Sequence, residues 1–352
     1  MSLMKKKFDL TSMSIDTEGG TSVPVPKLRN GLIANAFRGF GGGSEREVHG
    51  FVPLLRDEAS FEDLADDEAW LSEDETIACV GLRTDARKVP PDLLKRELNK
   101  RVKAWCEERG VEKAPKSIKK EIRELLEDEL LRKALPKTKV HQIWIDLANN
   151  RVYVDTVIEG KLDLVRKHLR RAGLEVRLAS PLVIPGTADM APSETFYAWL
   201  WMTGETNGGY IDLSDHGLHS AMLWVGDKVG LRQEHETKPT TIVTGENPSE
   251  QVTARSGLKN GWLVAQIKLD MVSQDQEYSV LLDGPSGRFK QVSAPGPEAE
   301  DDWGNVYVRL ELLKRFEALV SALVSTFART PLAEMERQLD AWMGKDSETD
   351  AA

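Results

Sequence analysis

Two aspartates that follow predicted β-strands are the residues best suited by type and spacing to metal-dependent chemistry. Asp146 ends the run 143–146, and Asp155 ends the run 151–155. If these strands pair, the two carboxylates could be cross-strand neighbours, and nucleases use clustered carboxylates to hold Mg²⁺ for phosphodiester cleavage. No third acid can be placed beside them from the sequence, and an aspartate at a strand end commonly accepts structural hydrogen bonds. A metal-dependent exonuclease is therefore kept as an alternative function.

The histidine, cysteine and serine patterns indicate no further catalytic or metal site. His216 and His219 have i, i+3 spacing, but no Cys or Glu beside them completes a metal-ligand pattern. Cys79 and Cys106 are the only cysteines, which gives no disulfide framework and fits a reducing cytoplasm. The Gly-x-Ser-x-Gly elbow of serine hydrolases is missing. We therefore assign no catalytic residue, no metal ligand and no cofactor, and expect a protein that is not an enzyme.

A glycine-rich stretch at residues 39–43 has the composition of a phosphate cradle but the wrong context. It follows a predicted helix, in which Leu28, Leu32 and Ile33 share one face, instead of preceding one. No Gly-Lys-Ser or Gly-Lys-Thr sequence follows it. We predict a flexible loop at this position.

The basic residues are concentrated in one part of an acidic chain. The formal net charge is −10 and the sequence pI is about 5.3, which taken alone argues against a nucleic-acid partner. Residues 83–139, however, contain 18 Lys and Arg against 11 Asp and Glu, whereas residues 57–75 contain ten acids and neither Lys nor Arg. Because a surface potential is set within a Debye length of about 8–10 Å, an acidic protein can still present a basic face. The simpler alternative is that these charges only solvate helix exteriors.

Two long amphipathic helices should carry those basic residues as an antiparallel hairpin. Pro91 suits a first helical turn, Gly110 ends the first helix, and Pro115 starts the second. Their apolar stripes, at spacings of three and four residues, are Leu94, Leu98, Val102 and Trp105 in the first helix, and Ile118, Ile122, Leu125 or Leu126, and Leu130 in the second.

Basic side chains on the polar sides of these helices and on the flanking strands could follow a phosphate backbone. Each neutralised phosphate releases counterions, which gives affinity without sequence preference. Zinc-finger, basic-zipper and aromatic RNA-binding signatures are missing. The residues predicted to contact DNA are Arg83, Lys88, Lys95, Arg96, Lys116, Lys119, Lys120, Lys137 and Lys139.

The remaining hydrophobic periodicity predicts an α+β fold with mixed or antiparallel sheets, an inserted long helical hairpin and a C-terminal helix. The expected strands cover residues 8–16, 48–54, 76–83, 140–147, 151–157, 175–184, 262–272, 277–282 and 288–292, with a further hairpin of 221–225 and 229–233 that turns at Gly226-Asp227. Helices are expected at 162–172, after Ser193, from Pro248 to about 256, across 310–327 and after Pro331.

Three parts of the chain are predicted from these elements. Residues 1–89 and 136–180 form an N-terminal α+β domain, 90–135 the inserted hairpin, and 181–352 a C-terminal α+β domain with terminal helices. The tail from Asp346 should be disordered. No apolar stretch approaches the roughly 20 residues that span a bilayer. The opening Met1–Met4 lacks the pattern of a secretory signal and suggests an expression leader.

The ordered set of motifs resembles the RdgC family over roughly residues 8 to 327. The resemblance is strongest around 77–172 and is weak from 181 to 247. It rests on segments that follow one another in the family's order: Gly50–Pro53, 77–82, Lys88–Pro90, Ala134–Pro136, 143–146, 151–155, 248–256, 265–270, 278–289 and 307–324. Between Pro136 and Trp144 this chain lacks the longer segment with an aromatic residue that the family usually has.

The resemblance implies a homodimer that closes into a ring and threads duplex DNA through a positively charged hole without sequence preference. It implies a cytoplasmic, nucleoid-associated protein that restrains recombination promoted by RecA-type recombinases, which it affects indirectly through DNA. The family is also sometimes labelled an exonuclease. Two-fold symmetry would bring two copies of each basic patch face to face, which answers the objection from the acidic total. A third alternative is a protein-interaction module whose acidic segment 57–75 docks a partner, without DNA binding.

Overall fold

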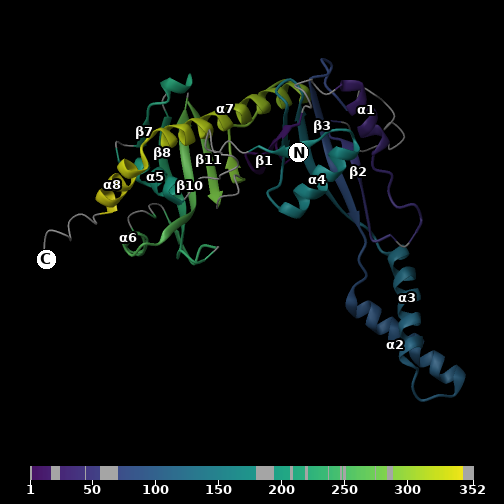
Figure 1. The fold of residues 1–352 in the computed structure, drawn as a ribbon. Helices are drawn as coiled ribbons and strands as arrows, with labels where there is room; N and C mark the ends of the chain where they lie inside the picture. The colour runs from purple at the N-terminus through teal and green to yellow at the C-terminus, as the bar shows by residue number, and fades with distance from the viewer. Residues whose placement is uncertain are drawn as a thin grey trace. The chain divides into compact units, whose positions relative to one another are not determined.

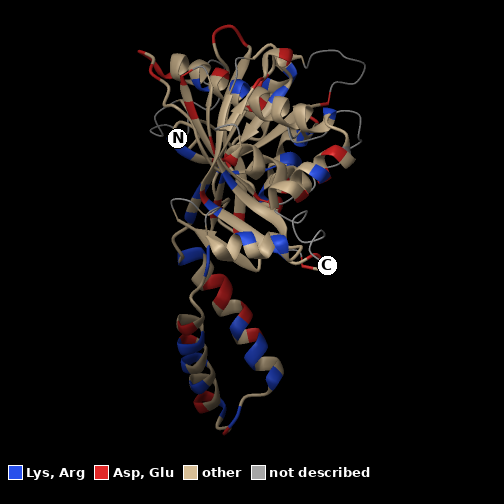
Figure 2. Cartoon of the chain, turned by 90° about the vertical axis from the view of Figure 1, so that its left-hand side faces the viewer, with Lys and Arg blue, Asp and Glu red and all other residues tan. Residues whose placement is uncertain are grey.

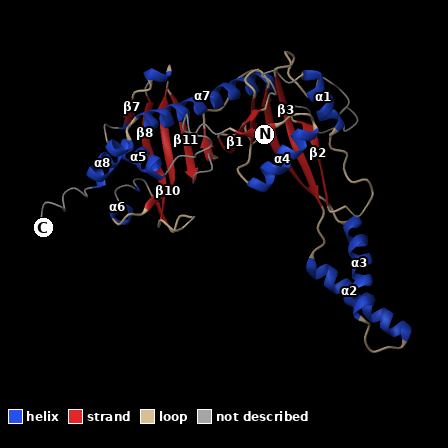
Figure 3. Ribbon diagram, viewed as in Figure 1, coloured by secondary structure: helices blue, strands red, loops and turns tan. Residues whose placement is uncertain are grey.

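A computed structural model of the chain describes residues 2–16, 24–43, 45–55, 70–179, 194–206, 209–218, 221–236, 238–245, 248, 251–273, 275–283 and 288–343. Several predicted features lie outside these residues: most of the acidic segment 57–75, the domain limit between residues 180 and 181, Ser193 before the expected helix, His219 and the tail from Asp346. The described residues form an α+β fold, as predicted (Figure 1, Figure 3).

The chain divides into two compact units. Unit 1 comprises residues 1–22, 144–166 and 175–352, and unit 2 comprises residues 23–143 and 167–174. The three domain limits inferred from the sequence stay a prediction. Across the described residues, no helix combines the length and the apolar character that crossing a bilayer requires.

Unit 2 contains a short antiparallel sheet and the helical hairpin. Its strands follow the order β2-β3-β4, and β2 pairs with β3 from Glu47 opposite Ala86 to Pro53 opposite Val80. The elements are α1 (Val25–Ala34), β2 (Glu47–Pro53), β3 (Ile77–Ala86), α2 (Pro91–Arg109) and α3 (Lys116–Lys133), with parts of β4 (Lys137–Asp146) and α4 (Glu159–Arg171).

The helical hairpin α2–α3 has the boundaries that its proline and glycine residues predict. Gly110 adopts the left-handed conformation (φ 63°) that terminates α2, and Pro115 is the N-cap of α3. Leu126, and not Leu125, is the inward residue of α3, since Leu125 is 63% exposed. No side chain of α2 is fully buried, so α2 contributes only a half-buried face to the hairpin. In unit 2 the hairpin projects from the ends of β3 and β4 (Figure 1).

Helix α4 buries the face that the sequence predicts. Leu162, Val165, Leu169 and Ala172 are at most 2% exposed. Gly173 follows with φ 85°, a conformation that favours glycine. Between β4 and β5, Asn150 has φ 52°, the left-handed conformation expected of an asparagine in a tight turn.

Unit 1 is a larger sheet that carries the long helix α7. Its strands follow the order β5-β1-β12-β11-β10-β8-β7, with β6 beside β1 and β9 beside β8. Its further elements are β1 (Lys7–Ile15), β5 (Arg151–Val154), β6 (Val176–Leu178), α5 (Glu194–Glu205), β7 (Tyr210–Ile211), the 3-10 turn Ser214–His216, β8 (Ala221–Arg232), β9 (Thr241–Thr244), α6 (Val252–Lys259), β10 (Leu263–Ser273), β11 (Gln276–Asp283), β12 (Phe289–Ser293), α7 (Asp302–Arg329) and α8 (Leu332–Met343).

The core of unit 1 forms where α7 packs on this sheet. The Phe316 ring lies 5.1 Å from that of Phe289 and 6.0 Å from that of Tyr278, between ring centroids. Arg309 is fully buried in the same helix, and its guanidinium donates to the backbone carbonyls of Met4, Lys5 and Pro295. These bonds attach the N-terminal segment to α7.

Two predictions for unit 1 were wrong in detail. The hairpin with a turn at Gly226-Asp227 is instead the single strand β8, which pairs with β10 along its length. Five residues of β8, from Val225 to Val229, lie opposite three of β10, from Leu269 to Ile267, so the Gly-Asp pair belongs to a bulge. The helix expected from Pro248 begins only at Val252 and continues to Lys259.

Candidate nucleic-acid interface

Six of the nine residues predicted to contact DNA have exposed side chains that are not engaged by any other described residue. No carboxylate lies within ion-pair distance of them among the described residues. These six lysines, called the open lysines here, are Lys88, Lys95, Lys116, Lys119, Lys137 and Lys139. Lys95, Lys116 and Lys119 belong to the hairpin, Lys88 to the segment that leads into it, and Lys137 and Lys139 to β4.

The other three predicted residues each have a carboxylate partner. Arg96 pairs with Glu97 (3.3 Å) and Lys120 with Glu124 (3.7 Å), both on the exposed surface of the hairpin. Arg83 donates twice to Asp85, from Nε (2.9 Å) and from Nη2 (3.0 Å). These cations are already partly neutralised, which makes them weaker candidates for phosphate contacts.

The rest of the hairpin surface mixes both charges. Residues 91–133 contain 13 Lys and Arg and 10 Asp and Glu, and Figure 2 shows the two colours alternating along both helices. Glu129 accepts from Lys133 and Arg101, and these hydrogen bonds lower its pKa to about 2. The hairpin surface as a whole therefore has only a small positive surplus.

Strand β3 ends in a charged row that faces one side of the sheet. Arg83, Asp85 and Arg87 alternate along the chain and so share a face. Burial alone would raise the pKa of Asp85, but hydrogen bonds from Arg83 and Thr138 hold it below the ordinary value. Arg87 was not predicted as a site residue, although its i, i+4 spacing from Arg83 on a strand was the available signal.

Asp146 accepts structural hydrogen bonds at the end of β4, which was one of the two roles expected for it. Its side chain is buried, accepts from the backbone and side-chain nitrogens of Asn149, and pairs with Lys314 of α7 at 3.1 Å. Asp155 accepts from the Ser2 hydroxyl. Within the described ranges no three His, Cys, Asp or Glu side chains are grouped closely enough to hold a metal ion. His216 faces Thr326 at 3.4 Å.

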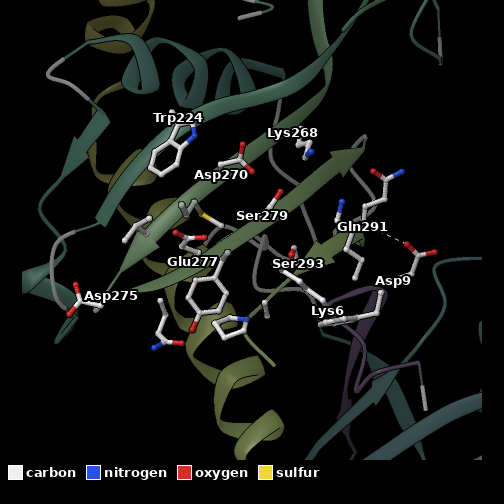
Figure 4. Close-up of a pocket in the computed structure, with 18 residues that line it drawn as sticks. Lys6, Asp9, Trp224, Lys268, Asp270, Asp275, Glu277, Ser279, Gln291 and Ser293 are labelled. Atoms are coloured by element: carbon white, nitrogen blue, oxygen red, sulfur yellow. Dashed lines mark hydrogen bonds between the residues drawn. The ribbon is translucent and has the colours of Figure 1, made fainter. Parts of the chain in front are cut away.

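A separate hollow of about 930 Å³ lies on the sheet of unit 1 (Figure 4). Trp224 is 42% exposed at its edge, and Lys268 and Asp270 project from β10 beside it. Four carboxylates and three lysines share the lining: Asp9, Asp270, Asp275 and Glu277 with Lys6, Lys7 and Lys268. This balance of charge does not favour a polyanion, and none of the residues predicted to contact DNA lies there.

The described residues thus define an α+β protein in which a helical hairpin with open lysines is inserted between two strands of a sheet. The family model described as "Putative exonuclease, RdgC" matches residues 19–221, which is more than half of the chain. The chain belongs to the RdgC family, as its ordered motifs predicted. No curated protein matches it.

Proposed function

We propose that this protein binds double-stranded DNA without sequence preference, through the lysines of the hairpin and of β4. The observation that carries the proposal is the set of six open lysines on neighbouring segments of unit 2. An exposed ammonium group without a carboxylate partner can contact a phosphate without first losing an ion pair, and it releases counterions from the duplex when it does so. Membership of the RdgC family supports the same function.

The proposal extends to a ring-shaped homodimer that restrains RecA-type recombination. Two copies related by a two-fold axis would present the open lysines twice, on facing walls, so that a protein of net charge −10 could still surround a duplex with cations. A protein of this kind acts on recombination by occupying DNA, and it needs no contact with the recombinase. The similarity to the family supports this extension.

The test compares two double variants that remove the same charge. Lys137→Gln with Lys139→Gln removes two open lysines, whereas Arg96→Gln with Lys120→Gln removes two cations that have carboxylate partners. Binding of a fluorescent duplex is followed by anisotropy over a series of salt concentrations. For each open lysine that contacts a phosphate, the slope of log K against log salt should fall by about 0.9.

The expected result is a clear loss of slope in the Lys137 and Lys139 variant and a smaller change in the control variant. Duplexes of different base sequence should bind with similar affinity. Equal slopes in the two variants would exclude Lys137 and Lys139 as residues of the proposed DNA interface. Failure of the unaltered protein to bind any duplex at low salt would overturn the proposal.

A further inference from the structure

Arg87 is a partly exposed cation that is held in place by an aromatic ring. Its guanidinium carbon lies 3.8 Å from the centroid of the Phe40 ring, so the two planar groups are in close contact. The backbone N–H of Arg87 donates to the carbonyl of Arg46 (2.8 Å), which extends the β2–β3 ladder by one residue. The base of the side chain is therefore fixed by the sheet and its planar end by Phe40.

This cation has no counter-ion in the part of the chain that the structure describes. Among the described residues no carboxylate and no other hydrogen-bond acceptor contacts the Arg87 side chain, and its Nε is buried without a partner. Arg83, on the same face of β3, also lies over a phenylalanine, Phe37, at 4.4 Å. Arg83, however, donates twice to Asp85, so its charge is already partly neutralised.

The segment that carries Phe40 leaves open space beside it. Gly39 and Gly42 have φ of 73° and 84°, and a Cβ placed on Gly39, Gly41 or Gly42 would meet no atom within 4 Å. Successive backbone N–H groups in such conformations can form a concave site for an anion. Arg38, on the same segment, is exposed and makes no ion pair with a described residue.

We propose that Arg87 and the loop Gly39–Gly43 form a binding site for a phosphate group, namely one phosphate of a nucleic-acid backbone. The stacked guanidinium keeps its planar fork of N–H donors in one orientation, which suits two oxygens of one phosphate. The loop amides complete the positive side of the site. The inference deepens the proposed DNA binding and rests on it, and it adds a contact outside the nine residues predicted from the sequence.

Acidic neighbours limit the affinity of this site and supply a second test. Glu45 and Glu47 are exposed on the chain that follows the loop, and the side chain of Glu45 approaches Gly43. Arg46, between them, pairs with Glu127 at 2.6 Å and so contributes less positive charge. Removal of the Glu45 charge should therefore strengthen phosphate binding.

The experiment uses the full chain and three arginine variants. Arg87→Gln removes the charge, and Arg87→Lys keeps it without the planar fork. Arg109→Gln is the matched control, because Arg109 also lies over an aromatic ring, that of Trp105 at 5.5 Å, but without a glycine-rich loop. Each protein is titrated with a short duplex over a salt series and, by calorimetry, with inorganic pyrophosphate.

Arg87→Gln should weaken duplex binding at low salt about threefold to tenfold and lower the salt slope by about 0.9. Arg87→Lys should fall between this variant and the unaltered protein, and only Arg109→Gln should keep full pyrophosphate binding. Glu45→Gln should tighten duplex binding about twofold, which tests the site even if Arg87→Gln folds poorly.

The outcomes separate this inference from the proposed function. If the unaltered protein binds duplex and both Arg87→Gln and Glu45→Gln bind it equally well, the phosphate site is wrong and the DNA binding stands. If the unaltered protein binds no duplex, the proposed function fails, and the calorimetric titration with pyrophosphate then tests the phosphate site by itself. A saturable heat of pyrophosphate binding that is lost only in the Arg87 variants would then show a site for a phosphate group that does not come from DNA. No heat, or equal heats in all variants, would overturn the inference.

Discussion

His168 illustrates how one buried side chain can make the stability of unit 2 depend on pH. It is 5% exposed, its Nδ1 has no hydrogen-bond partner, and its ring lies 5.6 Å from that of His49 and 6.1 Å from that of Phe51. Burial, with a smaller contribution from the positive charges of His49, Arg171 and Lys167, lowers the pKa of His168 to about 4.

The direction of the pH effect follows from proton counting. The pKa of histidine in the unfolded chain is about 6.5, so between about pH 4 and 6.5 the unfolded state binds more protons than the folded state. The free energy of unfolding therefore rises with pH in this window. The contribution of His168 is fully present above the window and is lost as the pH falls through it. The loss should reach about 2–3 kcal/mol at the acidic end.

Urea unfolding at several pH values tests this prediction. His168→Phe removes the titrating group and should flatten the dependence of the unfolding free energy on pH below 6.5. His235→Gln is the control, because His235 is exposed and should leave that dependence unchanged. A His168→Phe variant with the pH slope of the unaltered protein would contradict the prediction.

The individual site residues were predictable only where their partners are local in sequence. The lone position of Asp146 at a strand end predicted its structural role, and its acceptance from Asn149 confirms that role. Its ion pair with Lys314, from a helix far along the chain, gave no local signal. Arg87 was missed although its spacing from Arg83 was visible, because its contact with the Phe40 ring is set by tertiary packing.

At the scale of elements, strand β2 depends on a close backbone contact at Gly50. The segment that follows α1 crosses this strand, with the N–H of Phe37 donating to the carbonyl of Phe51 (2.8 Å) and the N–H of Phe51 to the carbonyl of Asn35 (3.0 Å). A Cβ on Gly50 would lie 2.4 Å from the Phe37 Cα and 2.8 Å from the Ala36 carbonyl carbon. These are backbone atoms, which cannot rotate away.

Gly50→Ala should therefore destabilise the protein by about 2–3 kcal/mol, because the crossing segment must shift. Gly160→Ala is the matched control: it lies in α4 with nothing within 4 Å of its added Cβ, so it should be neutral or stabilise by up to about 1 kcal/mol. Denaturant unfolding of both variants measures the difference. Equal stability of the two would show that the crossing segment yields easily.

Element boundaries were well predicted where proline and glycine act locally, as at Gly110 and Pro115 of the hairpin. Strand β8 shows the limit of this reasoning. A Gly-Asp pair between two β-rich runs is the pattern of a tight turn, but here β8 pairs with β10 on both sides of the pair and stays extended through a bulge, where Lys268 binds Asp227 at 2.8 Å. That partner strand begins more than 30 residues later, so no local pattern could reveal it.

At the scale of the whole molecule, the RdgC membership was predictable because it rests on the order of many weak motifs and not on one position. The division into units was harder to foresee. Unit 1 joins the N-terminal strand β1 to β12 near the other end of the chain, and such long-range pairing has no signal in local periodicity.

The proposed ring-shaped homodimer makes a prediction about the topology of bound DNA. In solution the particle should have twice the 39.3 kDa mass of the chain, measured by light scattering after gel filtration. A closed ring can leave linear DNA by sliding over an end, but it cannot leave a covalently closed circle without opening. When the salt concentration is raised enough to weaken the lysine–phosphate contacts, linear DNA should therefore be released quickly and circular DNA slowly. Bulky groups fixed to both ends of the linear DNA should restore slow release. Equal release from circular and linear DNA, or a particle with the mass of one chain, would rule out a closed ring and leave an open surface that binds DNA from one side.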